Sequence, residues 1–207
     1  MSGELFPGQT EDARFTLEQL KCLASAARAE VFWNTSARLP RSISEIAESL
    51  GRSPSATAYH VAELVEAGLV IPVGERKKRS RTEKLYVVSS ISILSTPAEE
   101  SAEYRQALMQ GYAAMLRLML RERTEVTHAF QSSPELAESV TFRRNLARIP
   151  LKRAVTFRKR LSELINEFSE NEVTASDLLF AMTVSLAPTL VESRRINGKI
   201  KKSKSDP

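Results

Sequence analysis

The sequence predicts a mainly α-helical fold with one small β-hairpin, and three observations predict it. Residues 42–70 contain two helical segments, each with a capping residue at its start, joined by a short turn that includes a glycine. Two short apolar segments, residues 69–73 and 85–88, flank a basic run and are typical of strands. Apolar residues recur at helical spacing through residues 97–193. We therefore expect a helical domain with a hairpin, followed by an all-helical domain.

Composition narrows the class of function. A chain of 207 residues is long enough for one domain or two modest ones, and its net charge of +5 favours an acidic polymer as partner. Cys22 is the single cysteine, which excludes internal disulfides and thiolate metal sites and suggests a reducing compartment. No apolar run is long enough to cross a membrane, and no signal peptide or nucleotide-binding motif is apparent. We expect a cytoplasmic protein that is not an enzyme and holds no cofactor or metal, with a metal site built from oxygen ligands as the alternative that stays open.

The first domain is expected to cover residues 16–95, after a polar, flexible N-terminal arm over residues 1–15. Thr16 caps a first helix over about residues 17–24, and a second helix follows over about 25–37. Trp33 lies in this second helix. It is either a core residue or the anchor of a dimer interface, because aromatic residues concentrate in interface cores.

The next two helices carry the most specific pattern in the chain. Ser42 and Glu45 have the spacing of a reciprocal capping box, and Gly51 can take the left-handed conformation that ends the first of the two helices. Ser53 caps the second, with Pro54 at its first position. Two capped helices joined by a three-residue turn form a helix-turn-helix, whose second helix enters the major groove of DNA.

A wheel at about 100° per residue separates the faces of this recognition helix. Ser55 and Tyr59 lie on the outward face and are the best candidates for contacts to base edges, with Ala56 and His60 toward one flank. The alternative is that the helix only completes a three-helix core or docks a protein. The residues expected to pack inward are Thr57, Val61, Leu64 and Val65.

A basic run follows the recognition helix. Residues 74–84 contain six basic and two acidic side chains, between the two expected strands. This position predicts a wing, a hairpin whose cations contact DNA phosphates, although a charge run is usually a solvated loop. The candidate phosphate contacts are Arg76, Lys77, Lys78, Arg79, Arg81 and Lys84.

Residues 17–88 resemble the ArsR-like winged-helix repressors. The likeness rests on the opening segment LKCLASAARAEVF, the helix-turn-helix SISEIAESLGRSPSATAYHVAELVEAGLV and the basic hairpin ending in EKLYVV. The resemblance implies a homodimeric, sequence-specific repressor of the prokaryotic cytoplasm that reads an inverted repeat in double-stranded DNA. Many members are metal sensors with clustered thiolates or histidines, and many have only a short helix after the wing; this chain departs from both patterns. The implied DNA contacts are the wing and Ser53, Ser55, Thr57, Tyr59 and His60, of which Thr57 conflicts with the wheel.

Residues 96–193 are expected to form a helical domain that holds the dimer. Helices are predicted over about residues 97–130, 134–149, 151–168 and 178–187, the last apolar almost all round and therefore buried. The first of them has an apolar surface broader than a lone surface helix needs, which implies burial by a partner subunit. The candidate interface residues are Trp33, Tyr104, Leu108, Tyr112, Met115 and Met119.

Two further basic segments follow in the C-terminal half. The basic cluster over residues 143–160 is more simply a solvated face than a second phosphate-contacting surface or a cradle for an anionic effector. Residues 194–207 are expected to form a flexible basic tail.

The favoured function is a DNA-binding transcriptional regulator. The alternatives are a winged helix that binds protein, and a sensor whose C-terminal helices enclose a small-molecule effector near the Tyr and Met side chains named above.

Overall fold

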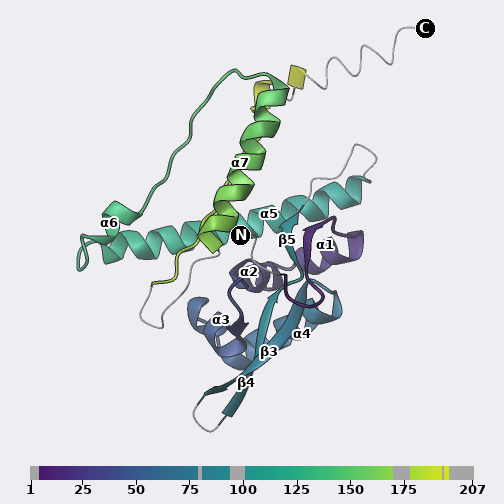
Figure 1. The fold of residues 1–207 in the computed structure, drawn as a ribbon, viewed down its shortest axis with the longest axis vertical. Helices are drawn as coiled ribbons and strands as arrows, with labels where there is room; N and C mark the ends of the chain where they lie inside the picture. Colours follow the sequence, from purple (N-terminus) through teal and green to yellow (C-terminus); the bar gives the residue numbers. More distant parts are fainter. Residues whose placement is uncertain (1–4, 79–80, 94–100, 170–177, 193, 196–207) are drawn as a thin grey trace. The chain divides into compact units, whose positions relative to one another are not determined.

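The computed structural model describes residues 5–78, 81–93, 101–169, 178–192 and 194–195. The chain divides into two units, with the division after Arg143. The first unit confirms the predicted fold class, because its helices are followed by a small antiparallel sheet that forms a wing (Figure 1). Its elements are β1 (Thr10–Ala13), α1 (Leu17–Leu23), α2 (Ala26–Asn34), β2 (Arg41–Ser42), α3 (Ile43–Ser49), α4 (Pro54–Glu66), β3 (Val70–Lys78), β4 (Arg81–Val88), β5 (Ser90–Ile93), α5 (Ala102–Ala129) and α6 (Leu136–Ser139).

The helix-turn-helix forms as its capping residues predict. The Ser42 hydroxyl accepts a hydrogen bond from the backbone of Glu45, and the Glu45 carboxylate accepts one from the backbone of Ser42 at 2.8 Å. Gly51 ends this segment with φ of 61°, a conformation that a side chain would strain. Ser53 caps α4 through the backbone N–H of Ala56.

The wing strands are longer than predicted. β2, β4 and β3 form an antiparallel sheet in that order, and the β3–β4 ladder runs from Val70 opposite Val88 to Lys78 opposite Arg81. Most of the basic run expected as a loop is therefore strand. Cross-strand pairs such as Arg76 opposite Glu83 support the extension, because opposite charges that face one another on neighbouring strands attract.

The N-terminal segment is part of the fold from residue 5, so the expected flexible arm over residues 1–15 is wrong for that part; residues 1–4 lie outside the described residues. The buried amide of Gln9 donates hydrogen bonds to the carbonyl oxygens of Ala37 at 2.7 Å and Val88 at 2.9 Å. β1 then pairs in parallel with β5, with Thr10 opposite Ser90. These bonds come from side-chain and strand-edge partners that apolar periodicity does not reveal.

One apolar core joins α1, α2, α3, α4 and α5 of the first unit. α5 packs on α1 and α2, so the start of the region predicted as 96–193 lies against the helix-turn-helix unit. Its buried face carries small residues, which allow close approach of the helix backbones: Ala107, Gly111 and Ala114, followed by Leu118. The largest fully buried apolar side chains include Leu20, Leu23, Val31, Ile46, Val61, Leu64, Leu69, Val70 and Val87.

Two of the predicted C-terminal helices are wrong. Of residues 134–149, only α6 is helical. In the second unit, α7 (Leu151–Ser169) forms as predicted, but residues 178–187 are neither helix nor strand, and Leu178 is 64% exposed rather than buried. An isolated helix of about ten residues is marginal in water without packing, and none of the described residues of this unit is buried. None of the described helices is long and apolar enough to cross a membrane.

Candidate nucleic-acid interface

The two faces of α4 divide as the wheel predicts. Thr57, Val61 and Leu64 are buried, whereas Tyr59 is 61% exposed and Ser55 is also exposed. Sequence reasoning therefore placed the outward side of the recognition helix correctly. Ala56 is exposed on the flank of that outward side.

Thr57 is the exception among the predicted DNA contacts. It has no exposed surface, and its hydroxyl donates to the Ser53 carbonyl oxygen at 3.1 Å. The contact that the family resemblance implies for Thr57 is therefore wrong for this structure, because the side chain completes the core. The Ser53 hydroxyl is exposed but already caps the helix, and it lies 3.3 Å from the Ser55 hydroxyl.

His60 lies at the flank of the outward face. Its ring packs edge-to-face with that of Tyr59, with 5.4 Å between the ring centroids, and its Nδ1 is buried without a hydrogen-bond partner among the described residues. Burial lowers the pKa of His60 below its ordinary value, and the cations of Arg52 and Arg28 lower it further against a smaller opposing effect of Glu63. The imidazole is therefore neutral at pH 7.

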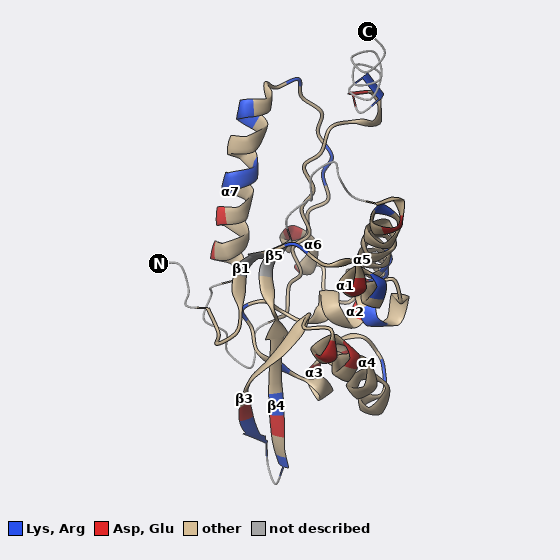
Figure 2. Ribbon diagram, turned by 90° about the vertical axis from the view of Figure 1, so that its right-hand side faces the viewer, with Lys and Arg blue, Asp and Glu red and all other residues tan. Residues whose placement is uncertain are grey.

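The wing presents its cations at the far end of β3 and β4, as Figure 2 shows. Lys77, Lys78, Arg81 and Lys84 are exposed, and Arg79 lies outside the described residues. Exposed cations on a hairpin next to a recognition helix can contact phosphates on both sides of a groove.

Arg76 differs from the other basic residues of the wing. Its guanidinium Nη2 lies 2.7 Å from Oε1 of Glu45 on α3 and 3.4 Å from Oε2 of Glu83 on β4. The charge of Arg76 is thus already paired within the protein. Charge spacing along the sequence did not reveal this role, because Glu45 lies 31 residues earlier.

The carboxylate of Glu45 makes two contacts, one with the start of α3 and one with the wing. Burial alone would raise the pKa of its carboxyl, but the hydrogen bond from the Ser42 backbone and the Arg76 guanidinium outweigh burial and bring the pKa below its usual value. A carboxylate that stays ionised both caps α3 and holds the wing strand.

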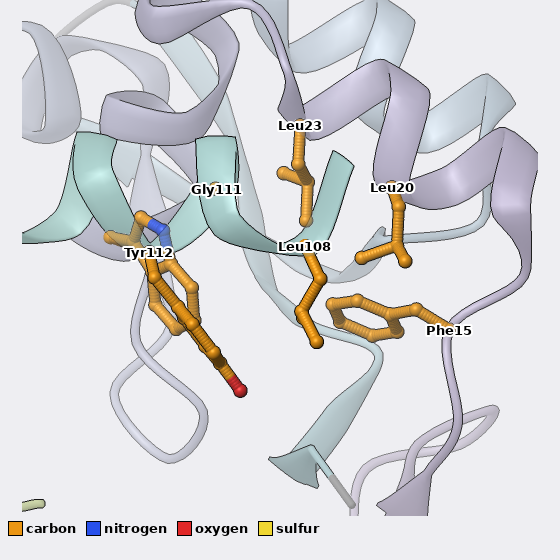
Figure 3. Close-up of a pocket in the computed structure, with 7 residues that line it drawn as sticks. Phe15, Leu20, Leu23, Leu108, Gly111 and Tyr112 are labelled. Atoms are coloured by element: carbon orange, nitrogen blue, oxygen red, sulfur yellow. The ribbon is translucent and has the colours of Figure 1, made fainter. Parts of the chain in front are cut away.

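The predicted dimer-interface residues mostly make contacts within the first unit. The Tyr104 hydroxyl donates to the Phe15 carbonyl oxygen at 3.0 Å, and Leu108 packs against the core. Trp33, Leu108 and Tyr112 line a small apolar cavity of about 10 Å³ (Figure 3). Small-molecule sites usually measure about 300–1,000 Å³, so this cavity is a gap in the packing rather than a site for an effector. Met115 and Met119 are half-buried.

The opposite face of α5 carries exposed apolar side chains that are not among the predicted interface residues, although the sequence indicated a broad apolar surface on this helix. Met109, Leu116 and Leu120 are each more than half exposed. Their spacing of seven and four residues places them on one stripe, away from the buried Ala107 and Gly111. A heptad search within the helix could have found this stripe.

Metal ligation receives no geometric support in the described part of the chain. No three His, Cys, Asp or Glu side chains there are placed to hold an ion. Cys22 is half-buried, and burial raises the pKa of its thiol.

Residues 23–73 match a protein family described as a helix-turn-helix domain. The chain contains a helix-turn-helix domain. The match covers α2, α3, α4 and the beginning of the wing, the segment whose outward face is described above. No curated protein matches the sequence. The helix-turn-helix domain supports DNA binding and points to a regulator rather than to an enzyme.

Proposed function

We propose that the chain is a transcriptional repressor of the ArsR-like kind that binds an inverted-repeat operator as a homodimer in a prokaryotic cytoplasm. The observation that carries the proposal is the juxtaposition of an exposed recognition face on α4 with an adjacent basic hairpin. The recognition residues are Ser53, Ser55, Ala56, Tyr59 and His60, and the phosphate contacts are Lys77, Lys78, Arg79, Arg81 and Lys84.

The different side-chain chemistry of α4 and of the wing supports the proposed DNA binding. Ser55 and Tyr59 offer hydroxyl groups that can bond base edges or phosphates, and the small residues at the start of α4 allow its backbone to approach the groove. The wing supplies the sequence-independent part of the affinity.

The exposed stripe on α5 supports the homodimer. Met109, Leu116 and Leu120 form an apolar surface that water covers in the isolated protomer. Packing this stripe against its copy would bury it by a two-fold contact, as in most homodimers. The half-buried Trp33, Tyr112, Met115 and Met119 would then border the contact rather than form its centre.

Selection of bound fragments from random duplex DNA, repeated across a salt series, tests the proposal. A palindrome whose half-sites are centred about one helical turn (~34 Å) apart is the expected result. Binding without a motif that vanishes steeply as salt rises would show that net charge alone attracts DNA. In that case an acidic protein partner becomes the better explanation of the wing.

A further inference from the structure

Glu30 of α2 joins two parts of the first unit that are far apart in the sequence. Its Oε2 lies 2.7 Å from Nη2 of Arg52 and 3.3 Å from Nη1 of Arg121. Arg52 belongs to the turn between α3 and α4, and Arg121 belongs to α5. The Glu30 side chain is only 12% exposed, so salt screens this three-way contact less than a surface ion pair.

Both arginines pair with this carboxylate. The Arg121 side chain is 40% exposed, but its Nη2 is buried with no hydrogen-bond partner among the described residues, and its Nη1 pairs with Glu30. Arg52 immediately precedes Ser53, the residue that caps the recognition helix. Its cation is also close enough to His60 to act on that ring.

We propose that Glu30 is a positioning residue for DNA recognition, which links the placement of α5 to the start of the recognition helix through Arg121 and Arg52. The inference rests on the proposed function. A shift of α5 that moves Arg121 changes how much of the Glu30 charge is available to Arg52. The turn that holds the first residues of α4 then moves with Arg52. α5 also carries the apolar stripe that is proposed above to form the dimer contact.

Equilibrium binding of the full chain to the selected operator and to a random duplex tests the inference. The variants are Arg121→Gln, Glu30→Gln, both together, and Arg117→Gln, which removes one charge from an exposed position of the same helix. We expect Arg121→Gln to weaken operator binding about three- to tenfold more than Arg117→Gln. Arg121→Gln should weaken random-duplex binding no more than Arg117→Gln does, because the charge of Arg121 is already paired with Glu30.

The double variant distinguishes a positioning role of Glu30 from a general effect of charge on operator affinity. In the Glu30→Gln background, Arg121→Gln should have no further effect on operator binding, since its partner is already gone. Equal losses for Arg121→Gln and Arg117→Gln, or losses that add in the double variant, would overturn the inference. All binding measurements are made well below the lowest thermal-unfolding midpoint among the four variants, so that the differences do not reflect partial unfolding.

A second readout needs no DNA and keeps this inference distinct from the proposed function. The titration of the His60 ring, followed by NMR and assigned with His60→Gln, reports on the position of Arg52. Arg121→Gln should raise the His60 pKa more than Arg117→Gln does, because the freed Glu30 carboxylate draws Arg52 away from the imidazole. Equal values in the two variants would refute the link even if the protein binds DNA. A larger shift together with no operator would retain the link and refute only the proposed repressor function.

Discussion

The guanidinium of Arg76 on wing strand β3 lies 2.7 Å from the carboxylate of Glu45, the residue that completes the capping box of α3. The wing is therefore tied to the first helix of the helix-turn-helix by a charge-assisted hydrogen bond, which is stronger than a bond between neutral groups. Its orientation beside α4 is set by this contact as well as by the β ladder.

Arg76→Ala should weaken operator binding without changing its salt dependence. The charge removed is already neutralised by Glu45 and Glu83, so no counterion release from DNA is lost. Affinity measured at four or more salt concentrations gives the slope of log K against log salt. A slope that flattens as it does for a neighbouring lysine would mean that Arg76 leaves Glu45 and contacts phosphate.

Lys78→Ala and Arg79→Ala should weaken binding to all DNA sequences alike. Each phosphate contact that is lost should flatten the salt slope by about 0.9. Thr82→Ala, an uncharged change in the same hairpin, is the matched control. If both lysine and arginine variants keep the slope of the control, the wing does not contact the phosphate backbone.

Tyr59→Ala should relax discrimination at one base position of each half-site. Its exposed ring and hydroxyl project from the outward face of α4, and a good base contact is worth about 1–3 kcal/mol of discrimination. Competition between operators with single base changes measures this effect. Tyr59→Phe separates the contribution of the hydroxyl from that of the ring, and uniform weakening by Tyr59→Ala would instead indicate a phosphate contact.

DNA affinity should rise as the pH falls, through protonation of His60. The pKa of His60 in the free protein lies below the ordinary value of 6.5, so the ring is neutral at pH 7. DNA phosphates favour the imidazolium, so the bound protein takes up the proton at a higher pH than the free protein does.

The same lowered pKa makes the free protein less stable in acid. The contribution of His60 to the free energy of unfolding is complete above pH 6.5 and is lost as the pH drops through the lowered pKa.

The pH dependence of DNA affinity is measured by binding titrations between about pH 5.5 and 7.5. They should show a pH dependence that His60→Gln reduces and His128→Gln keeps. An identical dependence in wild type and His60→Gln would assign the proton to another group.

Arg41→Met should cost about 2 kcal/mol of the free energy of unfolding, because its removal leaves half-buried carbonyl oxygens without the donor that the buried guanidinium supplies. The buried guanidinium donates to the carbonyl oxygens of Asn34 at 2.9 Å and Glu45 at 2.8 Å, and to the Ser49 hydroxyl. Urea denaturation measures the loss, with Arg14→Met as the control at an exposed position. A difference below about 1 kcal/mol between the two variants would show that these contacts add little to stability.

Local chemistry explains what the sequence could predict. Caps at Ser42 and Ser53 and the left-handed Gly51 act within a few residues of the chain, so spacing alone located α3, α4 and the turn. The period of the helix likewise separated buried Val61 from exposed Tyr59.

Contacts between residues far apart in the chain explain what the sequence could not predict. Arg76 counts as a free cation until Glu45 is brought beside it, and Glu30 shows no pattern until Arg52 and Arg121 converge on it. The predicted buried helix over residues 178–187 failed for a related reason. An apolar segment shows that a side chain gains from burial, but not that a surface is present to bury it.

The parallel pairing of β1 with β5 also bears on how the protein is made. Thr10 and Ser90 are partners, so the first strand emerges from the ribosome long before the strand that completes it. Until then, the amide of Gln9 lacks Val88, one of its two acceptors, and the strand edge is open to other chains. Helices form from local contacts within microseconds, but this closure must wait for translation of the whole hairpin. In the nascent chain, the helix-turn-helix (α3 and α4) can therefore form while β1 is still unpaired.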